Sequence, residues 1–490
     1  MESISKRLVP WLAGLSLVIG IAIAFASLPR SLWLDEFDII AQTRGLAPSQ
    51  FLNALRSDAH PLLYTGLIYG AQAAGISDIA VLRGLNIIGL PWALWPLWIC
   101  WRRGVLSLPE VSVAVALYAS SPNFLITFAD IRPYFILSSA SLAVSAVWLL
   151  MMRHDRTKAT REPILIWTLC LAVFVNLHYF ATLFGGVLTF FLLCQRAARR
   201  EWRSAAIIAA TSLFVAVPAL ALAVLQTHDV FVANYSYWIP AGLGAASSAA
   251  GEALLEGAAF NVPAVICAAI GLRGAFGPRA DRGWTHILLV AAIALFYAVL
   301  MVAHLLKPMI VERYLTAATG AITIALAIFT CAPPVPKWAP LAACVCALLV
   351  QGATFVFHWT SRHGWQFSAE RVAAMNAACP TTQIYTVPFA RVNGAAINAA
   401  PINPMDLAGR RLGYQYYASR LKFSYTELKP GNVVSAAGKC PSLVWFEHFW
   451  PVNEDTPEDV LQPLALRAAG PAEVKQIGDG SVIVLVRAAK

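Results

Sequence analysis

The chain has 490 residues, of which 59% are hydrophobic and only 13% are charged. A soluble domain averages about 25% charged residues, so this composition excludes an ordinary water-soluble protein and favours one that crosses a membrane repeatedly. The net charge of +10 would also suit a nucleic-acid-binding protein, but the positions of the basic residues indicate otherwise.

Apolar runs long enough to cross a hydrocarbon core, roughly 20 residues each, recur along the chain. We expect about eleven spans, at 8–27, 80–101, 108–125, 133–152, 163–178, 181–195, 204–225, 254–272, 284–305, 310–331 and 338–357. The first span lacks a small-residue cleavage pattern, so we expect it to be retained. Pro61–Ile76 is apolar but only about 16 residues long, and we expect it to lie on or dip into the outer leaflet.

Short linkers hold most of the Lys and Arg before residue 340. Cytoplasmic loops of membrane proteins collect these residues, and the spans above place every basic linker on one side. The basic charge therefore reports topology, and we expect no nucleic-acid partner. The pattern predicts a multi-pass protein of the bacterial inner membrane, surrounded by membrane lipids, with residues 226–253 and 360–490 in the periplasm. The basic linkers are Lys6/Arg7, Arg102/Arg103, Arg153–Arg161, Arg196–Arg203, Arg273–Arg282 and Lys337.

After Trp359 the composition becomes polar, and β-rich runs at 383–387, 442–446 and 481–486 alternate with helix-like stretches at 367–378 and 405–421. This alternation predicts an α/β domain of about 120 residues. We therefore expect a transmembrane module at 1–358, including the first outer loop 28–79, and a soluble periplasmic domain at 359–490. Cys379 and Cys440 lie in that domain, and an oxidising compartment favours a disulfide between them.

Three carboxylates lie within four residues directly after the first span, in Trp33-Leu34-Asp35-Glu36-Phe37-Asp38. Carboxylates in this arrangement suit the binding of a metal or the removal of a proton from a substrate. A solvated loop is the simpler explanation, although Trp33 and Phe37 favour a loop held against the membrane surface.

Further polar residues lie on the same outer side of the membrane. Asp58 precedes His60 and could orient or ionise it, or could cap a helix that begins near Pro61. Cations at the outer leaflet suit a lipid-linked phosphate. A simple salt bridge would also explain Asp130 and Arg132, and a structural role would also explain His178. The remaining groups are Asp130-Ile131-Arg132-Pro133-Tyr134, Asn176-Leu177-His178-Tyr179, and Glu312-Arg313-Tyr314 with His304 and Lys307 before it.

The middles of the spans are nearly free of charge, whereas a proton-coupled transporter more often binds its substrate near the bilayer midplane. The charges at the outer surface therefore favour a substrate with a polar head and a membrane-buried tail.

In order and spacing, these motifs resemble the GT-C superfamily of membrane glycosyltransferases, and within it the bacterial glycosyltransferase family 39-like group. That group includes relatives of protein O-mannosyltransferase and of lipid A aminoarabinose transferase. Ser31–Glu36 is similar to a Trp-x-Asp-Glu motif, Asp58–Tyr64 to a His-Pro-Pro-Leu-Tyr motif and Val81–Asn86 to an Arg-Leu-Pro-Ser motif. Leu62 departs from the paired prolines, and Gly84-Leu85 departs from Leu-Pro. The resemblance covers roughly residues 1–330.

The resemblance implies a GT-C-like polytopic helical fold and an inverting transfer of a sugar from a polyprenyl-phosphate donor to a lipid, glycan or protein acceptor. Asp35 would be the general base, and Glu36 would support the site electrostatically. Arg132, Arg313 and Lys307 would hold the donor phosphate. The remaining residues of the implied substrate site are His60, Asp130, Tyr134, His178, Tyr179, Glu312 and Tyr314.

Some superfamily members need a divalent metal, such as Mg²⁺ or Mn²⁺, at the first-loop acid and others do not. The resemblance therefore leaves a metal at Asp35 open. Two other functions stay open as well, namely a flippase or transporter for lipid-linked sugars and a non-catalytic membrane assembly protein. The motifs identify neither the sugar nor the acceptor.

Overall fold

The computed structural model describes residues 2–56, 60–153, 161–226, 239, 241–276, 283–360, 364–389, 391–393, 396–398, 404–436, 438–447, 456–477 and 481–488. Asp58 and the aromatic run Asn234–Trp238 lie outside these residues. The chain forms two compact units: unit 1 comprises Met1–Pro29 and Asp58–Trp359, and unit 2 comprises Arg30–Ser57 and Thr360–Lys490. The sequence predicts the first outer loop to belong with the membrane module. In the structure its residues 30–57 group instead with the C-terminal residues.

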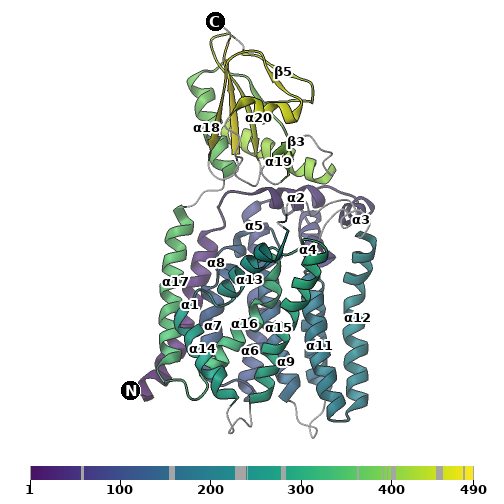
Figure 1. Cartoon of the computed structure of the whole chain (residues 1–490), viewed down its shortest axis with the longest axis vertical. Coiled ribbons are helices and arrows are strands. Elements are labelled where there is room, and N and C mark those ends of the chain that lie inside the picture. Colours follow the sequence, from purple (N-terminus) through teal and green to yellow (C-terminus); the bar gives the residue numbers. More distant parts are fainter. Residues whose placement is uncertain are drawn as a thin grey trace. The chain divides into compact units, whose positions relative to one another are not determined.

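Unit 1 is helical throughout its described part (Figure 1). Its helices are α1 (Glu2–Ala26), α4 (Leu62–Ala73), α5 (Ile79–Gly84), η1 (Leu85–Ile88), α6 (Gly89–Arg102), α7 (Leu108–Ser120), α8 (Pro122–Leu125), η2 (Thr127–Ala129), α9 (Tyr134–Arg153), α10 (Arg161–Val175), α11 (Tyr179–Ala198), α12 (Trp202–Gln226), α13 (Leu243–Gly257), α14 (Val262–Ala275), α15 (Gly283–Leu306), η4 (Glu312–Ala318), α16 (Thr319–Thr330) and α17 (Ala339–Thr360).

Within the described residues, eight helices are long and apolar enough to cross a membrane, or up to ten if two bent helix pairs each count as one span. The sequence predicts about eleven spans, and the difference is the expected span at 163–178. Helix α10 occupies that place with only 15 residues. At 1.5 Å per residue it is about 22 Å long, which is less than the hydrocarbon thickness of about 30 Å. Length alone therefore does not identify α10 as a span, and α4, with 12 residues, is too short to be one.

Two expected spans are broken by local helix-start signals. The span at 108–125 bends by 58° between α7 and α8, where the side chain of Ser121 accepts from the backbone N–H of Phe124 and Pro122 occupies the first turn. The span at 254–272 bends by 97° between α13 and α14. There Ala259 and Phe260 have φ values of 52° and 50°, in the left-handed region that seldom occurs inside a helix.

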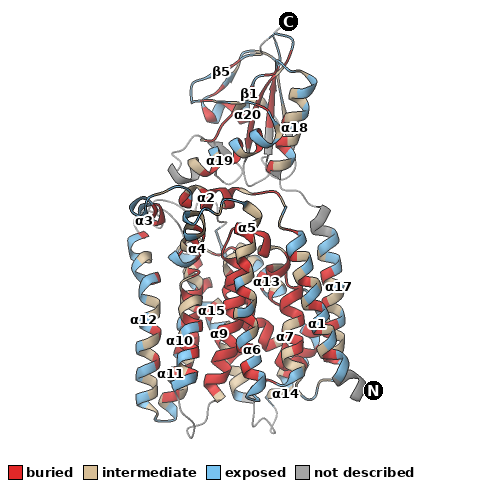
Figure 2. Cartoon of the chain, turned by 180° about the vertical axis from the view of Figure 1, so that it is seen from behind, coloured by how far each residue is buried: buried red, intermediate tan, exposed pale blue. Residues whose placement is uncertain are grey.

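Helix α9 lies at the centre of unit 1, and every residue of its membrane-crossing window is buried. Figure 2 shows α9 buried along its length, whereas the outer helices α12 and α17 expose much of theirs. Small residues allow α9 to approach α16 closely: the hydroxyl of Ser141 donates to the carbonyl of Ala317 (2.6 Å) and accepts from the backbone N–H of Gly320 (3.0 Å). A Cβ atom at Gly320 would clash with the backbone of Leu142. Close packing through small residues is typical of membrane helices.

Unit 2 contains a five-stranded sheet with the order β4-β1-β6-β9-β8. Strands β4, β1 and β6 run parallel, and β9 pairs antiparallel with both β6 and β8. This α/β arrangement has strands and helices where the polar tail predicts them. The helices of unit 2 are α2 (Leu34–Thr43), α3 (Pro48–Arg56), α18 (Gly364–Ala378), α19 (Pro404–Leu421), α20 (Pro457–Leu461) and η5 (Gln462–Leu464). The strands are β1 (Ile384–Thr386), β2 (Arg391–Asn393), β3 (Ala396–Asn398), β4 (Thr426–Glu427), β5 (Val433–Val434), β6 (Ser442–Glu447), β7 (Arg467–Ala468), β8 (Ala472–Ile477) and β9 (Ser481–Val486).

Alternating side chains of β6 contribute to two layers of this unit. Val444 and Phe446 join an aliphatic core with Val460 of α20. Trp445 lies on the opposite face of the sheet, because successive side chains of a strand alternate between its two faces. Its indole N–H donates to the hydroxyl of Ser368 on α18 (2.9 Å), and its ring contacts Tyr414 on α19.

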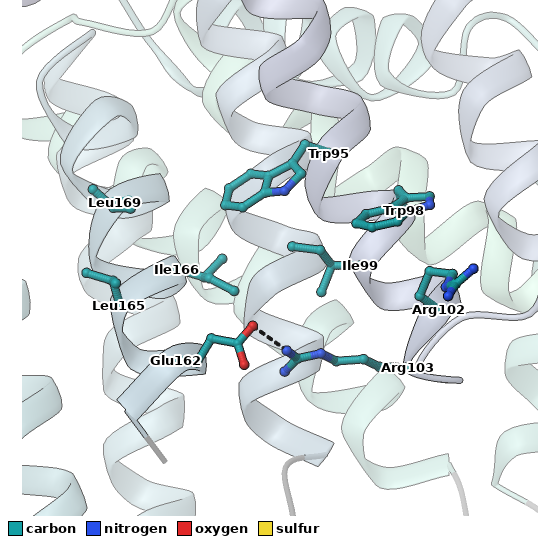
Figure 3. Close-up of a pocket in the computed structure, with 9 residues that line it drawn as sticks. All are labelled: Trp95, Trp98, Ile99, Arg102, Arg103, Glu162, Leu165, Ile166 and Leu169. Atoms are coloured by element: carbon teal, nitrogen blue, oxygen red, sulfur yellow. Dashed lines mark hydrogen bonds and ion pairs between the residues drawn. The ribbon is translucent and has the colours of Figure 1, made fainter. Parts of the chain in front are cut away.

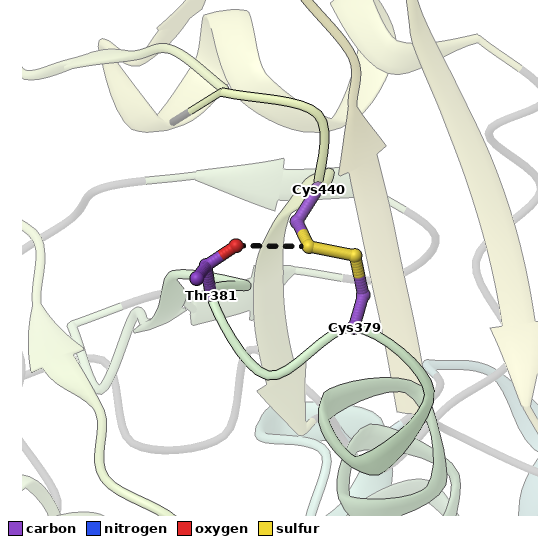
Figure 4. Close-up of a disulfide and its surroundings, with 3 residues drawn as sticks. All are labelled: Cys379, Thr381 and Cys440. Atoms are coloured by element: carbon purple, nitrogen blue, oxygen red, sulfur yellow. Dashed lines mark hydrogen bonds between the residues drawn. A yellow bond between two sulfur atoms is a disulfide. The ribbon is translucent and has the colours of Figure 1, made fainter.

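The disulfide expected between Cys379 and Cys440 is present, with Cα atoms 5.7 Å apart (Figure 4). It joins the end of α18 to the residue two before β6. The hydroxyl of Thr381 donates to the sulfur of Cys440 (3.0 Å). The bridge therefore links a helix on one layer of unit 2 to a central strand of its sheet.

Candidate functional site

Two histidines predicted as site residues lie together in unit 1. His178 is the N-cap of α11, and its Nδ1 accepts from the backbone N–H of Phe180 (3.2 Å). His60 lies just before α4, and its ring is 5.4 Å from that of His178. The side chain of Gln226, at the end of α12, donates to the carbonyl of His60 (3.3 Å) and accepts from the hydroxyl of Tyr179. Two helix starts are thus tied to one helix end.

Aromatic rings from three parts of the chain surround His178. Its ring centroid lies 5.1 Å from that of Tyr314 and 6.3 Å from that of Tyr134. The guanidinium of Arg313 lies over the ring of Tyr314, 5.8 Å from its centroid, which is within the range of a cation–π contact. We refer to His60, Tyr134, His178 and Tyr314 as the two-histidine cluster.

Burial and nearby cations hold the pKa of His178 well below its usual 6.5. Burial is the largest cause, because it disfavours the charged imidazolium. The charges of His60, Arg313 and Arg132 lower this pKa further, so both arginines lie close enough to the cluster to affect it electrostatically. His178 is therefore neutral near pH 7. Since its Nδ1 accepts a hydrogen bond, the proton of the neutral ring is on Nε2.

The loop that carries Asp130 and Arg132 is fixed by Tyr64 and Asn86, which belong to the two motifs that depart from the family pattern. The amide of Asn86 donates to the carbonyls of Phe128 (2.9 Å) and Asp130 (2.7 Å). The hydroxyl of Tyr64 also donates to the carbonyl of Asp130 (3.4 Å). Asp130 and Arg132 are only 5% and 7% exposed. An arginine buried this deeply needs compensating contacts, and the fixed loop holds it beside the two-histidine cluster.

Lys307 and Glu312 lie between the end of α15 and the start of η4. Glu312 begins η4, and its charge is felt at Glu256 of α13. Lys307 follows α15, close in sequence to His304. His304 is buried, and its Nδ1 accepts from the backbone N–H groups of Met309 and Ile310. His304 thus shapes the turn that leads to Arg313.

Asp35 and Glu36 lie in unit 2, in the first turn of α2. Carboxylates are favoured there by the partial positive charge of a helix N-terminus. Glu36 is fully buried and accepts from the backbone N–H of Trp33 (3.3 Å). This is half of a capping box, and Trp33 cannot supply the other half because an indole only donates. Asp35 is half-buried, so the two adjacent carboxylates differ in their surroundings.

The rest of α2 packs against the C-terminal part of unit 2. Phe37 is 1% exposed, and its ring contacts those of Trp365 (5.2 Å), Tyr416 (5.6 Å) and Tyr417 (6.1 Å). The hydroxyl of Tyr417 donates to the carbonyl of Leu32 (2.8 Å). A Cβ atom at Gly409 of α19 would clash with Asp38, so this glycine allows α2 and α19 to meet closely.

No group of three His, Cys, Asp or Glu side chains among the described residues gathers closely enough to hold a metal ion. Within α2, the carboxylate of Glu36 is already engaged in capping. These residues do not by themselves form a metal site, and the resemblance leaves a metal at Asp35 open.

Within unit 1 the structure brings His60, Tyr134, His178 and Tyr314 into ring contact, with Arg132 and Arg313 beside them. It does not add Asp35 or Glu36 to that unit. Sequence reasoning missed Gln226, Tyr64 and Asn86 as supports of the site. Tyr64 and Asn86 belong to motifs that the sequence analysis quotes, and those motifs were the signal by which both residues could have been found.

The chain is similar over nearly its whole length to two crystal structures of ArnT from Cupriavidus metallidurans. The structure bound to undecaprenyl phosphate has a TM-score of 0.50 and 13% identity, with 96% of this chain and 97% of that chain covered. The apo structure has a TM-score of 0.51 and 12% identity, with the same coverage. No protein-family model and no curated protein matches the sequence. The similarity lies in the fold: this chain shares the fold of these two structures, with multiple helices long and apolar enough to cross a membrane and an α/β unit that holds the C-terminal residues.

Proposed function

We propose that this protein is an inverting glycosyltransferase of the bacterial inner membrane, which takes a sugar from a polyprenyl-phosphate donor at the periplasmic face. The observation that carries the proposal is the whole-length likeness to ArnT, whose crystal structure holds undecaprenyl phosphate. The buried Arg132 and the neighbouring Arg313 support it, because both are cations in the unit that carries the membrane helices.

In the proposed reaction, Asp35 removes the proton from an acceptor hydroxyl. The acceptor oxygen then forms a bond to the anomeric carbon while the bond from that carbon to the phosphate oxygen breaks. Polyprenyl phosphate leaves with the bonding electrons, and displacement from the opposite face inverts the anomeric centre. The donor is a phosphodiester and the leaving group a phosphomonoester, so negative charge increases on the phosphate during transfer.

Arg132 and Arg313 are proposed to stabilise that increasing charge. Fixed cations in a site with little water are often the largest single contribution to catalysis. A neutral His178 fits the same role as a hydrogen-bond donor through Nε2–H, because its Nδ1 is already occupied. Glu36 is assigned to fixing the first turn of α2 and thereby the position of Asp35. Tyr134, Tyr179 and Tyr314 line or brace the binding surface for the donor.

The test offers radiolabelled polyprenyl-phosphate sugars to membranes that contain or lack the protein and follows the label. Covalent transfer to an acceptor is expected, whereas label that only changes leaflet would indicate a flippase. Asp35→Asn should lower turnover by about 10²–10⁴-fold, the usual contribution of a positioned base, and keep donor affinity. Asp38→Asn removes the same charge from the same helix and serves as its control. Near-normal transfer by Asp35→Asn would overturn the assignment.

Arg313→Ala should instead weaken donor binding. A charge-assisted hydrogen bond contributes about 1.5–3 kcal/mol, so the Kd for polyprenyl phosphate should rise by roughly ten- to hundredfold. Arg313→Lys keeps the charge and should recover part of the affinity. An unchanged Kd in Arg313→Ala would place the phosphate elsewhere.

A further inference from the structure

A groove at the opposite end of unit 1 from the two-histidine cluster has the composition of a lipid site. It lies between α6 and α10 and has a volume of about 470 Å³ (Figure 3). Both helices pack on α9, and the groove lies where their outer faces diverge. The residues that line it are Trp95, Trp98, Ile99, Arg102, Arg103, Glu162, Leu165, Ile166 and Leu169.

The lining is periodic on both helices. Residues 95, 98, 99 and 102 of α6 follow the i, i+3, i+4, i+7 spacing of one helix face, and so do residues 162, 165, 166 and 169 of α10. Trp98 is 52% exposed and Leu165 is 58% exposed. Such apolar side chains, outside a membrane helix bundle, meet lipid rather than water. The groove is therefore apolar and opens to the bilayer.

The charged residues are confined to one end of this groove. Arg102 and Arg103 end α6, and Glu162 begins α10. Arg103 pairs with Glu162 (2.5 Å), as Figure 3 shows. The guanidinium of Arg102 lies over the ring of Trp98, 5.8 Å from its centroid. Tryptophans mark the interfacial level of a bilayer, so the charged end is at the headgroup level.

We propose that this groove binds one anionic phospholipid of the cytoplasmic leaflet. Its phosphodiester contacts Arg102 and Arg103, and an acyl chain lies along Trp95, Leu165 and Leu169. Basic pockets between helices on the cytoplasmic side are a known way to bind anionic headgroups. Two arginines and one glutamate leave one net positive charge on the rim, which matches the single negative charge of a phosphodiester lipid such as phosphatidylglycerol. The cytoplasmic assignment follows from the basic linkers and is independent of the transfer reaction.

The roles of the two arginines differ. Arg103 is held by Glu162, so it presents a fixed direction for hydrogen bonding. Arg102 is exposed and is oriented by Trp98. Replacing Arg102 leaves no carboxylate of the groove without its partner, which makes it the cleaner position to test.

The test titrates delipidated full-length protein in detergent with phosphatidylglycerol and with phosphatidylcholine of the same acyl chains. Native mass spectrometry counts the bound lipids. Phosphatidylglycerol should bind with a Kd at least tenfold lower, which is about 1.4 kcal/mol. Arg102→Ala and Trp98→Ala should each remove that preference, and Trp98→Phe should retain part of it, because a phenyl ring keeps the cation–π contact.

Trp202 and Arg203 provide the matched control. They are also an exposed tryptophan and arginine in a basic linker, at the start of α12, but they do not line the groove. Trp202→Ala and Arg203→Ala should leave the preference unchanged. Equal binding of both lipids, or equal losses in the control variants, would overturn the proposal. Displacement of phosphatidylglycerol by polyprenyl phosphate or by soluble glycerol phosphate would assign the groove to another occupant and overturn it as well.

Discussion

Replacing Phe37 by alanine tests whether the first outer loop depends on the C-terminal residues of unit 2. The ring is 1% exposed and contacts three other aromatic rings, the nearest at 5.2 Å between centroids. Truncating a buried Phe to Ala costs roughly 3–5 kcal/mol, because both the transfer energy and the cavity term are lost. We therefore expect the opening free energy of α2 to fall by about that amount, and amide hydrogen exchange in α2 to accelerate by roughly 10²–10³-fold or more.

Hydrogen exchange with mass spectrometry on the full-length protein measures this change directly. Phe367→Ala is the matched control, since Phe367 lies on α18 and is 48% exposed, and surface substitutions usually stay within about 0.5 kcal/mol. Under the proposed function, Phe37→Ala should also slow sugar transfer, because α2 carries Asp35. Exchange in α2 that is as slow in Phe37→Ala as in Phe367→Ala would refute the packing argument.

Two further predictions concern pH and the disulfide. Because burial, His60 and nearby arginines hold the pKa of His178 well below 6.5, the unfolded chain binds a proton near that pH when the folded protein does not. The stability that this histidine contributes should be complete above about pH 6.5 and fall at lower pH by up to about 1.4 kcal/mol per unit. His178→Asn, which keeps an acceptor at the N-cap, should flatten that slope in thermal unfolding, and an unchanged slope would contradict the prediction. Removing the Cys379–Cys440 disulfide, which closes 61 residues of chain, should cost about 4 kcal/mol in the chain-entropy model. Urea unfolding measures the cost, and the exposed Cys194→Ala should leave stability unchanged.

Hydropathy predicted the long helices of unit 1, whereas the β-rich runs predicted three of the nine strands in the described part of unit 2, namely β1, β6 and β9. The expected strand at 442–446 becomes β6 (Ser442–Glu447), and the expected helix at 405–421 becomes α19 (Pro404–Leu421). The break before α14 was not predicted, although Asn261 caps that helix by accepting from the N–H of Ala264. A hydropathy window averages over about 19 residues, so it cannot register the left-handed φ of Ala259 and Phe260.

The candidate site was predicted by residue type but not by partner. His60 and His178 were predicted separately, each from its own motif, and nothing in either motif indicates that their rings meet. The same applies to Asn86, whose amide holds the loop 44 residues later. Motifs report which side chains a site needs, whereas long-range contacts depend on how helices pack, and that information is distributed over many small residues such as Ser141 and Gly320.

The division of the chain gives the C-terminal residues a specific part in the proposed reaction. The proposed base is on α2, which belongs to unit 2, and the proposed phosphate ligands Arg132 and Arg313 belong to unit 1. Helix α2 has only ten residues, and isolated helices of this length are unstable in water. Its stability must come from burying Phe37 against α18 and α19 and from the bond between Tyr417 and Leu32, 385 residues apart. Residues 360–490 are therefore needed to form the helix that carries Asp35.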